Sequence, residues 1–327
     1  MKNRRVVSGM RPTGKLHLGH FHGVLANWLE LQSGYECFFF AADWHSLTTE
    51  YANTAEIRDN TRDMVLDWLA FGIDPDRSTI FQQSLVPQHA ELNLILSMIT
   101  PVSWLERNPT YKEMQENLTA RDLSTFGFLG YPVLMASDII IYKAARVPVG
   151  HDQLPHLEIT REIARRFNHI YGPVFPEPEA LLTETPKLLG LDGRKMSKSY
   201  GNAIFLSESA EETRKKVMSM VTDVERPRRS DPGEPDRCVA WSLNHLYLRD
   251  GQKAEITVAC RGAQIGCVDC KKIQAEALVM TLAPFRAKRE ELAARPEIAE
   301  EVLAAGSRKA SIEAGKTMQE VRQAIKI

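Results

Sequence analysis

Apolar and polar residues alternate in blocks along the first part of the chain, and these blocks predict strands and helices. Residues 37–42, CFFFAA, form a continuous apolar run that is typical of a strand buried on both faces. Shorter apolar runs predict further strands at 6–7, 79–81 and 147–149. Apolar positions recur at helical spacing in the segments that begin at His20, Asn53, Tyr131 and Leu154.

The segment that begins at Asn53 carries signals for both ends of a helix. Asn53 and Glu56 form a predicted capping box, and Gly72 followed by Pro75 predicts an end near Phe71. Strands that alternate with helices in this way predict an α/β fold, with a parallel sheet covered by helices on both faces. Ligands of such sheets bind at the carboxyl ends of the strands.

The pattern changes near residue 200, after which helical periodicity dominates. Ser209 and Glu212 form a second predicted capping box. Helical stretches are predicted at 211–220, 273–282, 297–304 and about 316–327. We therefore expect a Rossmann-like domain over 1–200 and a mainly helical domain over 201–327, with the last helix packing back on the first domain.

Composition places the chain among globular proteins. Hydrophobic residues make up 43% and charged residues 25%, and no apolar stretch approaches the length of a membrane-spanning helix. Residues 1–5 lead directly into the first strand without a secretory leader, which predicts a cytoplasmic protein. The formal net charge of −1 disfavours a nonspecific coat on nucleic acid. Local basic clusters at 214–216 and 226–229 either meet phosphates or are ordinary solvated faces.

Two histidines flank Leu18 and Gly19 in the sequence HLGH, where the first strand gives way to a helix. The amino terminus of a helix attracts phosphate through its unpaired N–H groups and its dipole. Gly19 lets a flat adenine lie against the backbone because a Cβ there would intrude. His17 and His20 are candidate donors to a phosphate that gains charge in a transition state. The alternative is a pair of surface histidines beside a turn.

The sequence KMSKS, residues 195–199, follows a polar turn at 191–194. Two lysines three positions apart in such a loop can follow a departing pyrophosphate, which they would stabilise by position and charge alone. Arg11 and Lys112 are further candidate phosphate cations. For Lys112 the alternative is an ordinary lysine facing solvent.

HLGH and KMSKS in this order resemble the two signature sequences of class I aminoacyl-tRNA synthetases. The resemblance extends over essentially the whole chain and is greatest to bacterial tryptophanyl-tRNA synthetases. It implies a homodimer that activates L-tryptophan with Mg-ATP on a catalytic domain and reads the anticodon of tRNA(Trp) with a helical domain. Implied catalytic residues are His17, His20, Lys112, Lys195 and Lys198. Implied ATP-binding residues are Arg11, Thr13, Gly19, His20, Gly150, Asp152, Lys195, Met196, Ser197 and Lys198.

Residues 131–139, YPVLMASDI, and 147–153, VPVGHDQ, are similar to the amino-acid-binding helix and the substrate-binding turn of the tryptophanyl enzymes. An indole has one N–H donor, no acceptor and a large apolar surface, so one carboxylate among apolar groups is complementary to it. Asp138 supplies that carboxylate. Implied tryptophan-binding residues are His45, Tyr131, Met135, Asp138, Ile139, Val147, Val149 and Gln153. The alternatives are ordinary core for Met135 and Ile139 and a helix-surface position for Asp138.

Four of the five cysteines follow the spacing C-x21-C-x6-C-x2-C within the helical domain. They are Cys238, Cys260, Cys267 and Cys270. In a cytoplasmic protein this cluster favours a metal over disulfides. A subset of bacterial tryptophanyl enzymes has a similar late cysteine pattern and binds a four-iron four-sulfur cluster, which the resemblance therefore implies here. Zinc and four free thiols remain alternatives.

Three other functions share part of this pattern. Tyrosyl-tRNA synthetases have both signature sequences, but their amino-acid helix usually carries a polar residue where Met135 stands. A small-molecule nucleotidyltransferase shares the HxGH element but needs neither the full KMSKS loop nor a large helical domain. A non-catalytic RNA-binding relative would not need intact His17, His20, Lys195 and Lys198.

Overall fold

A five-stranded sheet forms the centre of one of two compact units in a computed structural model, which describes residues 4–108, 111, 122–182 and 188–327. The strands lie in the order β3-β2-β1-β4-β5, and every neighbouring pair is parallel. Their bounds are β1 Arg5–Met10, β2 Glu36–Ala41, β3 Ser78–Gln82, β4 Arg146–Val149 and β5 Glu179–Leu182. The predicted α/β fold and its four predicted strands are confirmed. The sequence pattern had not predicted β5.

The apolar run in β2 is buried on both faces of the sheet, as predicted. Phe39 stacks on Trp28, with ring centroids 4.2 Å apart. Its neighbour Phe38 points to the opposite face and stacks on Tyr142, at 4.7 Å. Large apolar side chains therefore cover both faces of this strand.

Helices account for most of the remaining chain. Their bounds are α1 Leu18–His20, α2 Ala26–Leu31, α3 Asp43–Glu50, α4 Ile57–Phe71, α5 Gln88–Ser97, α6 Val102–Glu106, α8 Phe126–Leu129, α9 Tyr131–Ile140, α10 Leu154–Tyr171, α11 Ala210–Ser219, α12 Val239–Asn244, α13 Asp250–Arg261, α14 Cys267–Ala293 and α15 Glu297–Ile325. A π-helical turn, Phe21–Leu25, joins α1 to α2. No described helix is both long and apolar enough to cross a membrane.

Several predicted helix boundaries are wrong, including both ends of the stretch predicted at 273–282, which is part of α14. The capping box at Asn53 and Glu56 does not form, because α4 begins only at Ile57, and Glu56 occupies the cap position without a side-chain hydrogen bond. The Ser209 and Glu212 capping box does form at the start of α11. The two short helices expected near the end of the chain are one helix, α15, since the small residues between them pack against the sheet.

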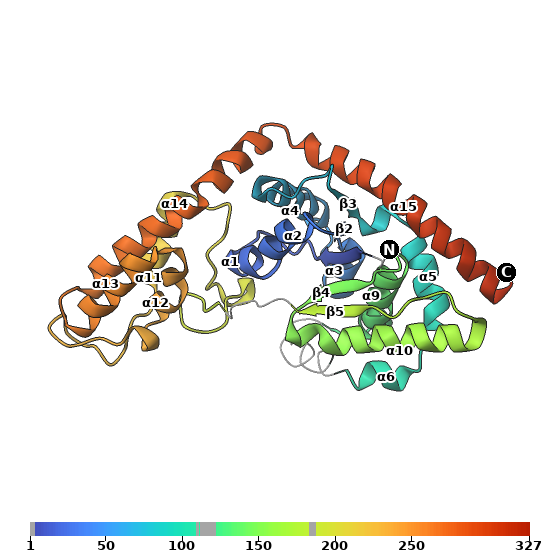
Figure 1. The fold of residues 1–327 in the computed structure, drawn as a ribbon, viewed down its shortest axis with the longest axis horizontal. Helices are drawn as coiled ribbons and strands as arrows, with labels where there is room; N and C mark the ends of the chain where they lie inside the picture. Colours follow the sequence, from blue (N-terminus) through green and yellow to red (C-terminus); the bar gives the residue numbers. More distant parts are fainter. Residues whose placement is uncertain (1–3, 109–110, 112–121, 183–187) are drawn as a thin grey trace. The chain divides into compact units, whose positions relative to one another are not determined.

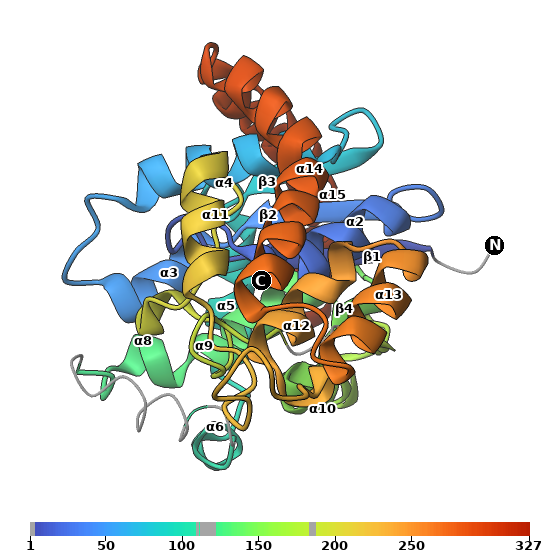
Figure 2. The same cartoon turned by 90° about the vertical axis from the view of Figure 1, so that its left-hand side faces the viewer.

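The chain divides into two compact units, and the division differs from the predicted boundary at residue 200. The first unit contains residues 1–14, 27–184 and 295–327, and the second contains 15–26 and 185–294. HLGH therefore belongs to the same unit as KMSKS. Figure 2 shows α14 of the second unit beside α11 and α12. In the first unit α15 runs along β3 (Figure 1).

Two glycines of α15 have very different surroundings. Gly306 lies directly against β3, where an added Cβ would be 1.8 Å from the carbonyl oxygen of Ile80. The neighbouring Ser307 hydroxyl accepts a hydrogen bond from the Gln82 N–H at 3.2 Å. A Cβ added at Gly315 would meet nothing within 4 Å. The absence of a side chain at Gly306 is what lets the helix approach the strand.

We expect Gly306→Ala to lower the free energy of unfolding by about 1–3 kcal/mol, because the helix must move away from the strand. Gly315→Ala in the same helix should raise it by ~0.5–1 kcal/mol through helix propensity alone. Urea unfolding of the two variants and the parent measures both effects. Equal stabilities for the two variants would contradict the close contact at Gly306.

Candidate active site and cysteine cluster

The HLGH histidines cap the amino terminus of α1 with their own rings. The Gly19 N–H donates to His17 Nδ1 at 3.0 Å, and the His17 N–H donates to His20 Nδ1 at 3.2 Å. A backbone N–H is always a donor, so both Nδ1 atoms accept and both rings carry their proton on Nε2. The two imidazoles are therefore preset as Nε2–H donors.

Both rings are neutral near neutral pH. Burial, and next the positive charge of Lys198, lower the pKa of His17 to about 4. Burial lowers the pKa of His20 well below its ordinary value, and the His17 and Lys198 charges add to this effect. A Cβ on Gly19 would lie 2.7 Å from His17 Cε1. This glycine thus makes room for the capping ring, in addition to any role beside adenine.

The KMSKS loop is held by Asn202, a buried residue that the sequence pattern did not single out. Its Oδ1 accepts from the Ser197 N–H at 2.8 Å, and its Nδ2 donates to Asp192 Oδ1 at 2.7 Å. The hydrogen bond from Asn202 Nδ2, together with the hydrogen bonds and charge of Arg194, lowers the pKa of Asp192 to about 2. A Cβ on Gly190 would lie 2.3 Å from Asn202 Cγ, so Gly190 provides the space for this amide.

Backbone hydrogen bonds join the two signature segments inside the second unit. The Leu18 N–H donates to the Ile204 carbonyl at 3.1 Å, and the Leu206 N–H donates to the Leu16 carbonyl at 2.9 Å. The chain just after KMSKS therefore runs alongside HLGH, and Lys198 is close enough to His17 to affect its pKa. Predicted site residues far apart in sequence are thus brought together. Lys112 lies outside the described residues.

The other predicted ATP-binding residues of the first unit follow the sheet strands. Arg11 comes directly after β1, where its Nη2 donates to Thr49 Oγ1 at 3.3 Å. The Thr13 N–H donates to the Arg11 carbonyl at 2.9 Å and closes a turn there. Gly150 follows β4 and caps a short 3-10 turn, His151–Gln153, which contains Asp152. The carboxyl ends of these parallel strands are where a sheet of this type binds ligands.

Asp138 is completely buried in α9 and is surrounded by hydrogen-bond donors. Gln83 Nε2 donates to both carboxylate oxygens, at 2.8 Å and 2.9 Å. His89 Nδ1 donates to Oδ1 at 2.6 Å, and His45 Nε2 donates to Oδ2 at 2.9 Å. Behind His89, its Nε2 accepts from the Tyr142 hydroxyl at 2.7 Å. The sequence pattern did not identify Gln83, His89 or Tyr142, because no local spacing links them to Asp138.

Asp138 remains ionised in this setting. Burial by itself raises the pKa of its carboxyl, but the hydrogen bonds from His45 and His89 outweigh burial and hold the pKa below its ordinary value.

The remaining predicted tryptophan-binding side chains differ in exposure. Ile139, Val147 and Val149 belong to the main apolar core of this unit, and Met135 packs on it partly buried. Near them, the Tyr131 hydroxyl and His156 Nε2 are hydrogen-bonded at 2.6 Å.

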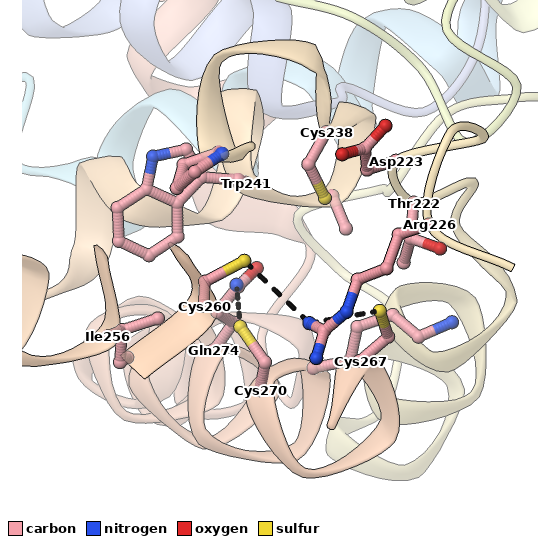
Figure 3. Close-up of a pocket in the computed structure, with 13 residues that line it drawn as sticks. Thr222, Asp223, Arg226, Cys238, Trp241, Ile256, Cys260, Cys267, Cys270 and Gln274 are labelled. Atoms are coloured by element: carbon pink, nitrogen blue, oxygen red, sulfur yellow. Dashed lines mark hydrogen bonds between the residues drawn. The ribbon is translucent and has the colours of Figure 1, made fainter. Parts of the chain in front are cut away.

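The four late cysteines line one pocket, shown in Figure 3. None of them forms a disulfide. The cavity between them has a volume of about 20 Å³. Burial raises the pKa of the Cys270 thiol to about 12. Among the described residues, no three His, Cys, Asp or Glu side chains are arranged to hold a single metal ion.

Two polar side chains reach the sulfurs from inside this pocket. Arg226 Nη1 lies 3.8 Å from Cys260 Sγ and 3.9 Å from Cys267 Sγ, and Gln274 Nε2 donates to Cys270 Sγ at 2.9 Å (Figure 3). Arg226 Nε is buried without a hydrogen-bond partner in the described structure. Arg226 and Gln274 thus bring N–H groups close to three of the four sulfurs, as the donors around a sulfur-ligated group do.

The sequence left open whether the basic clusters at 214–216 and 226–229 meet phosphates or are solvated faces, and the structure shows how several of their side chains are placed. Arg226 is buried among the cysteines, where its Nη2 donates to two backbone carbonyls at 2.8 Å. In the other cluster Arg214, Lys215 and Lys216 pair with Glu276, Glu211 and Glu208. Cations paired with carboxylates offer little free charge to a polyanion.

We expect the free energy of unfolding to fall as pH drops from 6.5 to about 4, because unfolded His17 takes up a proton over this range while folded His17 does not. Above pH 6.5 this residue contributes no pH dependence, since it is neutral in both states. His17→Asn keeps an acceptor at the cap but cannot be protonated, so its unfolding free energy should fall less. Urea unfolding across this range gives both curves, and parallel curves would rule out a buried neutral His17.

Known proteins resemble this chain over nearly its full length. The sequence pattern of the family described as "tRNA synthetases class I (W and Y)" matches residues 1–283. Tryptophan–tRNA ligase of Thermotoga maritima is 52% identical, and that of Aquifex aeolicus is 48% identical. These alignments cover 99% of this chain and 99% and 100% of the relatives, respectively.

A solved structure, the tryptophanyl-tRNA synthetase of Campylobacter jejuni complexed with ADP and tryptophan, superimposes with a TM-score of 0.90. It is 32% identical, and the alignment covers 99% of this chain and 100% of that one. The fold, the joined HLGH and KMSKS segments and these similarities agree, and the chain belongs to the class I tRNA synthetases of the tryptophan and tyrosine family.

Proposed function

We propose that this protein ligates L-tryptophan to tRNA(Trp) in two steps. The tryptophan carboxylate attacks the α-phosphate of Mg-ATP, which releases pyrophosphate and gives tryptophanyl-adenylate. The terminal ribose of the tRNA then attacks the mixed anhydride and releases AMP. The observation that carries this proposal is the backbone pairing of HLGH with the segment after KMSKS, which gathers phosphate-binding donors and cations in one unit.

The proposed roles follow from charge and hydrogen bonding. His17 and His20 donate from Nε2 to the α-phosphate, while Lys195 and Lys198 follow the departing pyrophosphate. No side chain forms a covalent intermediate, so the rate depends on orientation and charge stabilisation. Lys112 is proposed as a further phosphate cation. ATP is held in addition by Arg11, Thr13, Gly19, Gly150, Asp152, Met196 and Ser197.

Tryptophan selectivity is proposed to depend on Asp138. An ionised carboxylate can only accept hydrogen bonds, which suits the indole N–H, whereas an apolar side chain offers it no donor. The substrate ammonium is assigned to Tyr131 and Gln153. The apolar wall is assigned to Met135, Ile139, Val147 and Val149, and His45 is assigned to the lining of the same pocket.

Exchange of labelled pyrophosphate into ATP, measured with each amino acid, tests the activity. We expect tryptophan alone to support exchange. Lys195→Ala should lower the exchange rate by roughly a hundredfold or more with little change in tryptophan affinity, because the lysine acts in the transition state. Lys288→Ala, an exposed lysine of the same unit paired with Glu291, is the matched control. Exchange that depends on tyrosine, or on no amino acid, would overturn the proposal.

We further propose that Cys238, Cys260, Cys267 and Cys270 hold a four-iron four-sulfur cluster, with zinc as the alternative. Four thiols in one pocket, together with the donors of Arg226 and Gln274, support an anionic sulfur-rich group. When bound, such a group would cross-link this helical region and take no part in ATP chemistry.

The helical region is proposed to read the anticodon, and the chain is proposed to act as a homodimer. Both assignments rest on the family resemblance.

Protein purified without oxygen should contain about four iron atoms and four acid-labile sulfides per chain, with visible absorbance. Cys267→Ser should lower both contents. Cys37→Ser, a buried cysteine of β2 outside the pocket, should leave both unchanged. One zinc atom per chain, or no metal, would contradict the cluster and leave the ligase proposal intact.

A further inference from the structure

The carboxylate of Asp138 has no free hydrogen-bonding position. A carboxylate offers about four lone-pair sites, two on each oxygen. Oδ1 accepts from Gln83 and His89, and Oδ2 accepts from Gln83 and His45. An indole N–H that binds this carboxylate must therefore replace one of the donors already there.

Two of the three donors are fixed from behind. Gln83 is fully buried, and its Oε1 faces the backbone N–H of His45 at 3.4 Å, which directs its Nε2 at the carboxylate. The His89 side chain is also fully buried. The ionised carboxylate only accepts, so His89 Nδ1 carries a proton aimed at Asp138, and a 2.7 Å hydrogen bond between Nε2 and the Tyr142 hydroxyl anchors the other side of the ring. Neither donor can leave without breaking a second buried hydrogen bond.

His45 differs from both of them. Its side chain is 11% exposed, compared with 0% for His89 and 2% for Asp138. Its ring makes one hydrogen bond described in the structure, from Nε2 to Asp138 Oδ2. A partly exposed donor can satisfy its N–H with water when it moves, so it is the donor whose replacement costs least.

We propose that Asp138 recognises the indole N–H by exchange: His45 releases Oδ2 to the substrate, while Gln83 and the His89–Tyr142 pair hold the carboxylate in place. This inference rests on the proposed tryptophan specificity and deepens it. His45 keeps the buried charge paired in the empty pocket, and His89 with Tyr142 are positioning residues. In this proposal His45 moves because the indole N–H replaces it as a donor to Oδ2, and apolar contact with the substrate is not sufficient.

Proton–nitrogen correlation spectra of the full chain with isotope-labelled histidine test the exchange. We expect two strongly downfield N–H signals, from His45 Nε2 and His89 Nδ1. Coupling patterns distinguish Nε2–H from Nδ1–H, and the signal that is lost in His45→Gln identifies His45, because His17 and His20 also carry an Nε2–H. Saturating tryptophan should shift the His45 signal upfield or remove it and leave the His89 signal in place. A His45 signal that is missing beforehand, or unchanged by saturating tryptophan, would overturn the proposal.

Tyr142→Phe tests the positioning pair, because it removes only the hydroxyl that fixes His89. The readout is the ratio of dissociation constants for tryptophan and its benzothienyl analogue, in which sulfur replaces the indole N–H. We expect the preference for tryptophan to fall by roughly three- to tenfold, with little change in analogue affinity. Tyr171→Phe, a tyrosine packed on the same core, is the control and should keep the parent ratio.

A ratio that stays unchanged in Tyr142→Phe would assign this hydroxyl a purely structural role and overturn the positioning claim. Failure of the ligase proposal gives a different result, since the parent would then show no tryptophan-dependent pyrophosphate exchange. If the parent protein catalyses pyrophosphate exchange but its His45 signal does not change with tryptophan, only the inference that His45 releases Asp138 would be overturned.

Discussion

A buried ionised carboxylate imposes the strictest condition on this structure. Removing a charge from water is expensive unless hydrogen bonds replace the lost hydration. Asp138 meets this condition with donors that come from three parts of the chain: α3, the turn after β3, and α5. In the proposed function the same carboxylate selects the indole. Fold stability and substrate choice would then depend on one set of hydrogen bonds, which would limit how far either can change alone.

The HLGH histidines also combine a structural task with a proposed chemical one. Helix starts usually satisfy their free N–H groups with serine, threonine or aspartate. Here the acceptors are imidazole Nδ1 atoms, and this choice leaves a proton on each Nε2. Burial and Lys198 keep the His17 ring neutral, so the cap is retained near neutral pH and the donor is ready before any ligand binds. Preset donors cost little reorganisation when charge develops on a phosphate.

In the cysteine pocket the spacing of the cysteines and the side chains around the sulfurs give different kinds of information about the site. Spacing alone indicated a metal-binding cluster. The basic stretch at 226–229 suggested a surface for phosphates, yet Arg226 turns inward and lies within 4 Å of two sulfurs. A buried guanidinium next to thiols favours negative charge at sulfur. The chemistry of this pocket is therefore set as much by Arg226 and Gln274 as by the cysteines.

The sequence by itself determined the parts of this protein that depend on neighbouring residues. The apolar run of β2, the Ser209 cap, and the HLGH and KMSKS motifs are local patterns, and each was interpretable from its own segment. The Asn53 cap was predicted wrongly because a turn, closed by the Ile57 N–H and the Thr54 carbonyl, precedes α4, which begins only at Ile57. Only the tertiary structure decided that Gln83, His89 and Tyr142 surround Asp138, that Asn202 holds the KMSKS loop, and that HLGH belongs to the second compact unit. Partners separated by many residues leave no periodic trace in a sequence, since their meeting depends on strand order and helix packing.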